Sequence, residues 1–265
     1  MTDVELQRID AGASYHGGDF AVEHVSHEYV SSGRRTPALA DVTFAIPAGH
    51  VCCVVGPSGC GKSTLLSLAA GLLLPSSGRL ISDGEVVRLG PNKHIGMAFQ
   101  QPGLFPWLTV LQNVAIGLRT RGLARREARR IAEEFLATVG LADFQDAYPS
   151  QLSGGMAQSV GIARALALQP RLLLLDEPFA AVDAFTRLKL QQELLALLRR
   201  YRPTVMFVTH DVAEAIAVGD MIVVMSARPA SVLRIIPVDA RDRNRASAAF
   251  AHKLGETLEC LGVTQ

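Results

Sequence analysis

The chain has 265 residues, of which 49% are hydrophobic and 19% charged, and its 26 basic and 25 acidic residues give a formal net charge of +1. This composition excludes a long disordered chain and provides enough apolar residues for one large α/β domain. The near-neutral balance also excludes a generally polycationic nucleic-acid binder. No run reaches the roughly 18 uninterrupted apolar residues that a bilayer span needs, so the sequence predicts no membrane-spanning helix.

The first part of the chain is predicted to be mostly β-structure. Residues 1–19 are polar and rich in glycine, which predicts a loose leader. Apolar residues alternate over 20–30 and 38–46, as in two antiparallel strands. Residues 51–55 are wholly apolar, which predicts a strand buried on both faces in a parallel sheet. The four cysteines of the chain show no metal-ligand spacing, and the two within this run are interpreted as small buried thiols.

A glycine-rich loop follows this strand and matches the phosphate-loop pattern G-x-x-x-x-G-K-[ST]. The glycines let successive backbone N–H groups point at phosphate oxygens, and a helix predicted over 62–73 adds the positive end of its dipole. Lys62 would reach the β and γ phosphates, and the Ser63 hydroxyl would bind Mg²⁺. The loop predicts a P-loop NTPase. Its nucleotide-binding residues are Gly56, Pro57, Ser58, Gly59, Cys60, Gly61, Lys62, Ser63 and Thr64.

The middle of the chain changes from strands to helices. After an apolar strand over 95–99, residues 102–167 show helical patterns without a buried strand, which predicts a helical insertion. One amphipathic helix is expected over 127–139. Arginines precede or open this helix with glutamates between them, and we interpret the stretch as a solvated helix face rather than a nucleic-acid patch. These arginines are Arg119, Arg121, Arg125, Arg126, Arg129 and Arg130.

Short apolar runs return in the second half of the chain and alternate with helical patterns, which argues for a mostly parallel sheet covered on both faces. Strands are predicted over 172–175, 205–208 and 221–225, and helices over 154–168, 187–200 and 212–218. The expected fold is therefore α/β, with an antiparallel N-terminal β part. One domain is predicted over 20–238 with a helical subdomain inserted at about 102–167, followed by a short helical tail over 239–265.

Two adjacent carboxylates end the apolar run at 172–175. In open parallel sheets ligands bind at the carboxyl ends of the strands, which is where Asp176 would lie. Asp176 can hold Mg²⁺ through water, and Glu177 is placed to orient or deprotonate the attacking water. The pair therefore predicts hydrolysis of the bound nucleotide.

Further motifs follow in order. Residues 152–158 read Leu-Ser-Gly-Gly-Met-Ala-Gln and resemble the signature motif of ATP-binding cassette (ABC) ATPases. Gln100, Asp183, His210 and Tyr29 resemble the family's Q-loop glutamine, D-loop aspartate, switch histidine and adenine-stacking aromatic residue. The resemblance covers nearly the whole chain and implies a RecA-like P-loop NTPase core that binds ATP and Mg²⁺.

The resemblance also implies a role for each matched residue. The catalytic residues would be Glu177, His210, Gln100 and Lys62, and the Mg²⁺ ligands would be Ser63, Gln100 and Asp176. In the family the signature loop faces the nucleotide of the opposite subunit, which implies a homodimer with two shared sites. The residues acting on the partner's nucleotide would be Ser153, Gly154, Gly155, Gln158 and Asp183. For Tyr29, a half-buried strand tyrosine stays open as the alternative to a stacking platform.

Residues 96–110 and 226–229 are similar to the ATPase subunits of nitrate, sulfonate and taurine importers. This likeness implies a subunit on the cytoplasmic face of a bacterial inner membrane that energises uptake of a small anionic solute. Its partners would be separate permease subunits and, indirectly, an extracytoplasmic solute-binding protein, with no nucleic acid. The sequence departs from the family pattern at Ala157, Ser159, Val182 and Met221.

Other functional classes explain the sequence less well. The alternative is a soluble, non-transport ABC ATPase, but the chain holds neither the long coiled coils of repair types nor the second cassette of translation types. A small-molecule kinase would leave residues 152–158 and His210 unexplained. The only tryptophan, Trp107, is either a core residue or a partner contact, and we predict that Phe105 and Trp107 contact a permease helix.

Overall fold

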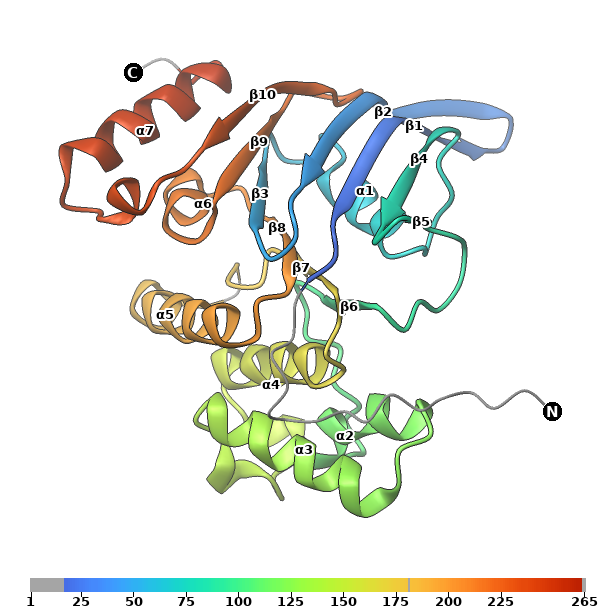
Figure 1. Ribbon diagram of the computed structural model, residues 1–265, viewed down its shortest axis with the longest axis vertical. Coiled ribbons are helices and arrows are strands. Elements are labelled where there is room, and N and C mark those ends of the chain that lie inside the picture. Colours follow the sequence, from blue (N-terminus) through green and yellow to red (C-terminus); the bar gives the residue numbers. More distant parts are fainter. Residues whose placement is uncertain (1–16, 181, 264–265) are drawn as a thin grey trace.

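The computed structural model describes residues 17–180 and 182–263, which form two β-sheets with helices around them (Figure 1). The first sheet is antiparallel, with the strand order β2-β1-β4-β5. The second has the order β10-β9-β3-β8-β7-β6, and its strands are parallel except for β10 at one edge. The strands are β1 (Phe20–Ser31), β2 (Arg34–Ile46), β3 (Val51–Val55), β4 (Ser77–Ser82), β5 (Glu85–Val86), β6 (Ile95–Ala98), β7 (Leu172–Asp176), β8 (Thr204–Val208), β9 (Met221–Met225) and β10 (Val232–Pro237).

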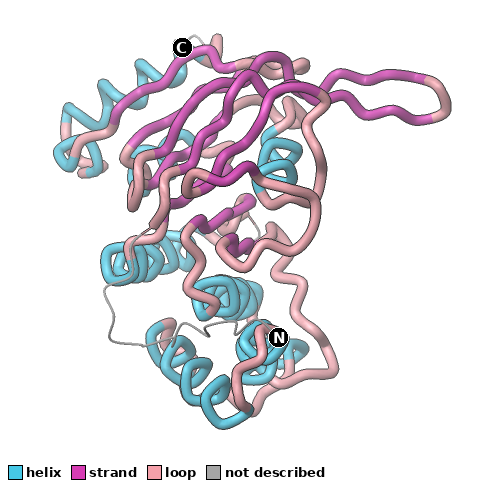
Figure 2. Tube along the Cα trace, turned by 45° about the vertical axis from the view of Figure 1, so that its right-hand side comes forward, coloured by secondary structure: helices cyan, strands magenta, loops and turns pink. Residues whose placement is uncertain are grey.

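The inner strands of the six-stranded sheet, such as β3 and β8, are buried on both faces, as their apolar runs predict, whereas the edge strand β10 is mostly exposed. Because successive side chains of a strand point to opposite faces, Cys52 and Val54 belong to one core and Cys53 and Val55 to the other. The first core contains apolar residues of α1 (Lys62–Ala69) and the four-stranded sheet, and the second contains those of the remaining helices. Cys52 and Cys53 are both fully buried, which confirms their interpretation as buried thiols, and burial raises the pKa of the Cys52 thiol. Figure 2 shows the two sheets as layers above the helical end of the molecule.

The remaining helices are α2 (Val110–Thr120), α3 (Arg125–Thr138), α4 (Gly154–Ala167), α5 (Ala184–Tyr201), α6 (Val212–Val218) and α7 (Ala248–Cys260). Residues 102–167, all of them described, contain α2, α3, α4 and two 3₁₀ turns without a strand, as the helical patterns predict. Figure 1 places α2 and α3 at the end of the molecule farthest from the antiparallel sheet, with α4 and α5 between.

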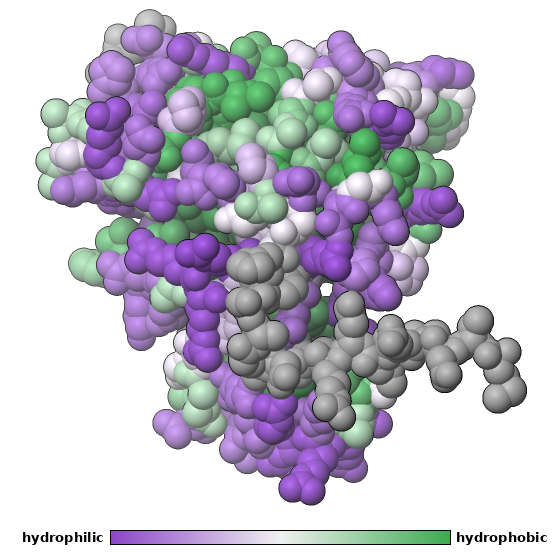
Figure 3. All heavy atoms as spheres, in the orientation of Figure 1, coloured by the Kyte–Doolittle hydropathy of each residue, from purple (hydrophilic) through white to green (hydrophobic). Residues whose placement is uncertain are grey.

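The arginine-rich stretch forms a solvated helix face. Arg129 pairs with Glu133 at 2.8 Å and Arg130 with Glu134 at 2.5 Å, each one helical turn apart on α3. Such exposed pairs stabilise a helix by only a few tenths of a kcal/mol each, about 0.3–0.5 kcal/mol. Hydrophilic side chains cover this end of the molecule in Figure 3.

The structure differs from the local expectations at the end of α1 and in four elements that were not predicted. Helix α1 ends at Ala69 and not near residue 73, because Gly71 takes a positive φ of 70°, where an added Cβ would lie 2.5 Å from the Arg88 carbonyl oxygen. Strands β4, β5 and β10 and helix α2 were not predicted as separate elements. Strands β4 and β5 are short and lack a strong apolar pattern. They form because β4 pairs with β1 and β5 pairs with β4.

The two ends of the chain also differ from expectation. Residues 1–16 of the predicted leader lie outside the described residues, but Gly17 and Gly18 are buried and fixed. The Gly17 N–H donates to the Arg202 carbonyl at 2.9 Å, and the Thr204 hydroxyl donates to the Gly18 carbonyl at 2.7 Å. The tail is not one helix: a 3₁₀ turn over 240–243 precedes α7, whose N-cap is Ser247.

Candidate active site

Most of the predicted catalytic residues follow neighbouring parallel strands of one sheet. The phosphate loop follows β3, His210 lies two residues after β8, Asp176 ends β7, and Gln100 lies two residues after β6. These strands are adjacent in the order β3-β8-β7-β6. Because the carboxyl ends of parallel strands meet at one sheet edge, the polar side chains converge there.

The phosphate loop has the backbone conformation that anion binding needs. Gly59 and Gly61 adopt φ values of 75° and 131°, in the region that favours glycine. A Cβ on Gly61 would lie 2.9 Å from Leu39 Cδ2 and 3.0 Å from the Ala38 carbonyl oxygen, so the loop also packs too closely for a side chain. Gly61 is the N-cap of α1 and supplies no side-chain cap, which leaves the first N–H groups of α1 available to phosphate oxygens.

Lys62 is folded into its own loop. Its side chain is buried, and Nζ donates to the carbonyl oxygens of Gly56 at 2.8 Å and Pro57 at 3.0 Å. Both acceptors are neutral carbonyl oxygens, whereas a phosphate oxygen carries the charge opposite to that of the ammonium and would compete with them for Nζ. The loop therefore holds the ammonium beside the N–H groups that bind phosphate.

Ser63 and Asp176 form the site that fits Mg²⁺. The Ser63 hydroxyl donates to Asp176 Oδ1 at 3.2 Å, which brings a hydroxyl and a carboxylate together at the start of α1. Mg²⁺ prefers such hard oxygen ligands and keeps water and phosphate oxygens in its other positions, so these two groups fit the ion. Ser63 and Asp176 would hold the ion, which when bound would offset the negative charge of the phosphates. Burial raises the pKa of Asp176, and the Ser63 hydrogen bond opposes that shift.

Glu177 and His210 lie together beside this site. Glu177 Oε2 is 3.1 Å from His210 Nδ1, and the Glu177 backbone N–H donates to the Val208 carbonyl at 2.9 Å. Glu177 has a positive φ of 42°, which is uncommon for a residue other than glycine and is often found at functional sites. The carboxylate side chain is 21% exposed, so it is accessible to a water molecule that attacks the γ-phosphate.

Gln100 and Tyr29 are both exposed, and Tyr29 contacts the end of the phosphate loop. Gln100 is exposed, and the carbonyl of its neighbour Phe99 accepts a hydrogen bond of 3.2 Å from Gln158 Nε2. The Tyr29 hydroxyl is 3.1 Å from Thr64 Oγ1, and the ring is 41% exposed with His27 packed edge-on at 4.8 Å between centroids. An exposed ring beside the phosphate loop is compatible with the stacking interpretation, which stays a prediction.

The signature and D-loop residues are exposed at the starts of two helices. Ser153 caps α4 by accepting from the Met156 N–H at 3.3 Å, and Gly154 beside it is exposed. Asp183 caps α5 through bonds to the N–H groups of Phe185 and Thr186, and the bond to Thr186 lowers its pKa. Both helix ends thus keep a polar cap at the surface. Ala181, between them in the chain, lies outside the described residues.

Gln158 and Gly155 are buried inside their own chain, and their role toward a partner's nucleotide stays a prediction. The Gln158 side chain is 3% exposed, and its amide donates to Phe99 within the same chain. Gly155 is buried against α5, where a Cβ would lie 2.8 Å from Thr186 Cγ2. Gln158 thus links α4 to the end of β6, and Gly155 lets α4 pack closely against α5.

A polar network behind Glu177 was missed by the sequence interpretation. Asp211 pairs with Arg187 at 3.5 Å, and its Oδ1 accepts from the Glu214 N–H at 3.1 Å. Glu214 is buried, accepts from Gln191 Nε2 at 2.9 Å, and has its pKa raised by burial. The signal was present as an Asp followed three residues later by Glu, the spacing of a helix cap just after a buried strand. This network fixes the start of α6, next to His210.

We expect Asp176→Asn to raise the melting temperature near neutral pH while weakening binding of Mg²⁺-ATP. Burial raises the pKa of this carboxyl, so keeping it ionised costs the folded state free energy at any pH above its folded pKa. That cost vanishes below the ordinary pKa of 3.8, where both states are protonated. The stability gain should therefore shrink as the pH falls, in thermal melts run across pH. The exposed Asp143→Asn is the control, and a lower melting temperature for Asp176→Asn at neutral pH would contradict the expectation.

The family model described as ABC transporter matches residues 39–180. The chain belongs to the ABC transporter family. An ABC transporter ATP-binding protein of Methanocaldococcus jannaschii, MJ0412, is 46% identical over 230 residues, with 86% of each chain covered. The taurine import ATP-binding protein TauB of Pseudomonas aeruginosa is 43% identical over 217 residues, covering 82% of each.

Solved structures of ABC cassettes share the fold. The dimeric structure of MJ0796, a bacterial ABC transporter cassette, has a TM-score of 0.75 and 33% identity, and covers 83% of this chain and 99% of that one. CbiO1 of Clostridium perfringens, part of the ABC transporter complex cbiONQ, has a TM-score of 0.75 and 28% identity, covering 92% and 96%. The predicted P-loop NTPase fold is confirmed, and the chain is an ABC-type ATPase that binds ATP. Among the described residues, no helix is both long and apolar enough to cross a bilayer.

Proposed function

We propose that the chain is the ATP-hydrolysing subunit of an importer for a small anionic solute of the taurine, sulfonate or nitrate kind. It works as a homodimer on the cytoplasmic face of the cell membrane, with separate permease subunits and, through them, a solute-binding protein. The observation that carries the hydrolytic part is the Glu177–His210 pair beside Ser63 and Asp176. The 43–45% identity to taurine import ATP-binding proteins supports the choice of solute class.

Two shared ATP sites are part of this proposal. The N-terminus of α4 exposes Ser153 and Gly154, and N–H groups at a helix start bind anions such as a γ-phosphate. Neither Ser153 nor Gly154 takes part in the Ser63–Asp176 hydrogen bond of its own chain. A second copy related by a twofold axis would bring these helix starts to the nucleotide, and the dimeric MJ0796 cassette supports this arrangement.

The permease contact is assigned to the segment that follows Gln100. Trp107 is 70% exposed, which makes the core interpretation of this tryptophan wrong, and its ring lies 5.6 Å from that of Phe105. Fully buried Asn113 holds the segment in place: Oδ1 accepts from the Phe105 N–H at 2.7 Å, and the two hydrogens of Nδ2 are shared among the carbonyls of Phe105, Leu108 and Thr109 at 3.0–3.1 Å. An aromatic pair on a rigid loop is a suitable anchor for a partner helix.

We expect Trp107→Ala to weaken binding to the permease by about 1–3 kcal/mol, the range for an interface anchor. The melting temperature and the ATPase rate of the isolated subunit should change little, because the side chain is exposed and does not contact the phosphate loop. Leu233→Ala, which truncates a side chain 52% exposed on β10, is the matched control. Co-sedimentation with permease-containing membranes beside thermal melting measures both effects. Unchanged membrane binding by Trp107→Ala would contradict the assignment.

The proposed function as a whole is tested by isolating the chain from membranes and identifying the permease that co-purifies. The complex is then placed in proteoliposomes with its solute-binding protein, and ATP hydrolysis is measured with taurine, an alkanesulfonate and nitrate in turn. Stimulation by one of these solutes, and none by an uncharged sugar, is the expected result. Recovery of the active chain without any membrane protein would favour the non-transport ABC ATPase instead.

A further inference from the structure

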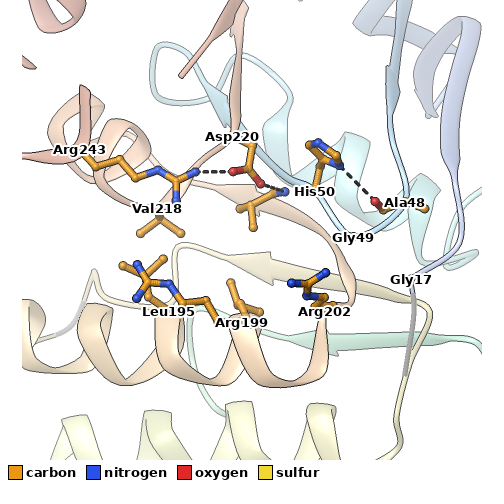
Figure 4. A pocket seen from close by; sticks show the side chains of 12 residues that line it. Gly17, Ala48, Gly49, His50, Leu195, Arg199, Arg202, Val218, Asp220 and Arg243 are labelled. Carbon is orange, nitrogen blue, oxygen red and sulfur yellow. Dashed lines mark hydrogen bonds and ion pairs between the residues drawn. The ribbon is translucent and has the colours of Figure 1, made fainter. Parts of the chain in front are cut away.

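A cavity of about 410 Å³ lies at the edge of the six-stranded sheet opposite to the phosphate loop. His50 and Val51 line it at the amino end of β3, whereas the phosphate loop follows the carboxyl end of the same strand. The other walls come from the last turns of α5 and from residues before β9 (Figure 4). None of its lining residues takes part in the ATP site described above.

The cavity combines apolar walls with basic side chains. Leu195, Leu198, Val51 and Val218 supply apolar surface. The basic groups come from three separate parts of the chain, which Figure 4 shows around one opening. They are His50 before β3, Arg199 and Arg202 at the end of α5, and Arg243 before α7.

The acidic side chain in the cavity is already committed to other partners. Asp220 Oδ2 accepts from the Val51 N–H at 2.8 Å, and Oδ1 forms an ion pair with Arg243. Arg199 and Arg202 are exposed at this opening, and neither forms an ion pair with a residue within 17–180 and 182–263. Arg243 Nε is buried without a hydrogen-bond partner in that same part of the chain.

Helix capping does not account for this arrangement. Basic residues in the last turn of a helix interact favourably with its dipole, and Arg199 and Arg200 occupy that turn of α5. Arg200 is not among the residues that line the cavity, and its guanidinium lies 5.3 Å from the centre of the Tyr201 ring. Arg202 lies beyond the last helical residue, and the dipole explains neither the cavity nor the unpartnered Nε of Arg243.

We propose that this cavity binds a small organic anion, with its anionic group at Arg199 and Arg202 and its apolar body against Leu195 and Val218. Guanidinium groups match the geometry of carboxylate, sulfonate and phosphate oxygens, and the volume is that of a small-molecule site. Because the cavity and the phosphate loop lie at opposite ends of β3, the anion binds together with nucleotide and does not compete with it.

The test is isothermal titration calorimetry on the full chain saturated with Mg²⁺-ADP, so that the phosphate loop is occupied. The probes are hexanesulfonate, heptanoate and hexyl phosphate, which carry the same hexyl chain on three different anionic groups, with hexanol as the uncharged control. We expect saturable one-to-one binding of at least one anion and none of hexanol. No saturable binding of any of the three anions would overturn the proposal.

Three variants locate the binding. The double variant Arg199→Ala/Arg202→Ala should weaken it about 10–100-fold, as expected for the loss of charge-assisted bonds. Arg200→Ala, on the same turn but outside the cavity, should leave it unchanged. Leu195→Trp keeps both arginines and fills the cavity, so it should also abolish binding, with thermal melting to show that the chain is folded. Binding retained in a folded Leu195→Trp, or weakened equally by Arg200→Ala, would refute the cavity as the site.

Discussion

We expect Glu177→Gln to lower ATP hydrolysis about 10²–10⁴-fold while ATP affinity stays the same. The amide keeps the shape of the side chain and can still bond to His210, whose Nδ1 lies 3.1 Å from Glu177 Oε2, but it cannot accept a proton from water. Binding should persist because the phosphate loop, Ser63 and Asp176 are unchanged. Single-turnover hydrolysis and equilibrium ATP binding measure the two effects separately.

The same variant should form a stable dimer with ATP, because nucleotide that is not hydrolysed keeps the two subunits together. Size-exclusion chromatography with light scattering, with ATP and without it, checks the change in mass. Glu133→Gln, which removes an exposed carboxylate of α3, is the control and should hydrolyse ATP normally. Near-normal turnover by Glu177→Gln would show that this carboxylate is not the base.

The second large effect is expected at Ser153. Adding Ser153→Arg to the Glu177→Gln chain should abolish the ATP-driven dimer, because a bulky cation at the start of α4 would block the partner's γ-phosphate from the helix N–H groups. Ser247→Arg is a closely matched control, since Ser247 also caps a helix by accepting a backbone N–H three residues on. Each substitution removes one cap, worth about 1 kcal/mol, so fold stability should fall equally.

Comparing Ser153→Arg with Ser247→Arg shows whether Ser153 acts on the partner's nucleotide or only caps its own helix. Loss of the dimer in Ser153→Arg alone, with similar melting temperatures for both, would support sharing of the ATP sites between chains. Equal loss of the dimer in Ser247→Arg would mean that helix capping, and not the partner's nucleotide, is the reason. A persistent dimer with Ser153→Arg would contradict the shared sites.

The sequence by itself determined the parts of this protein that depend on neighbouring residues. The phosphate loop needs glycines at Gly59 and Gly61 because their φ values are positive, and this requirement is local. The strand over 51–55 was predictable because burial on both faces requires an unbroken apolar run. Asp176 and Glu177 were predictable because such a strand places the next polar residues at its carboxyl end.

Only the tertiary structure decided which way side chains of the helical part point. Gln158 belongs to the same motif as Ser153, yet packing of α4 against β6 turns its amide toward Phe99 and leaves Ser153 at the surface. Trp107 is exposed because Asn113, six residues later, is buried and holds the segment's backbone in place. Neither outcome follows from periodicity, because both depend on which elements meet.

The cavity lined by basic side chains is the strongest example of that dependence. The residues that line this cavity come from distant parts of the sequence, and no local pattern connects them. His50 and Arg243, for example, are 243 − 50 = 193 positions apart. They meet because β3 and β9 are neighbours in the sheet and α5 packs beneath the amino ends of its strands. Local conformation is set by a residue's neighbours in the chain, whereas the charge around a cavity is set by contacts between distant segments.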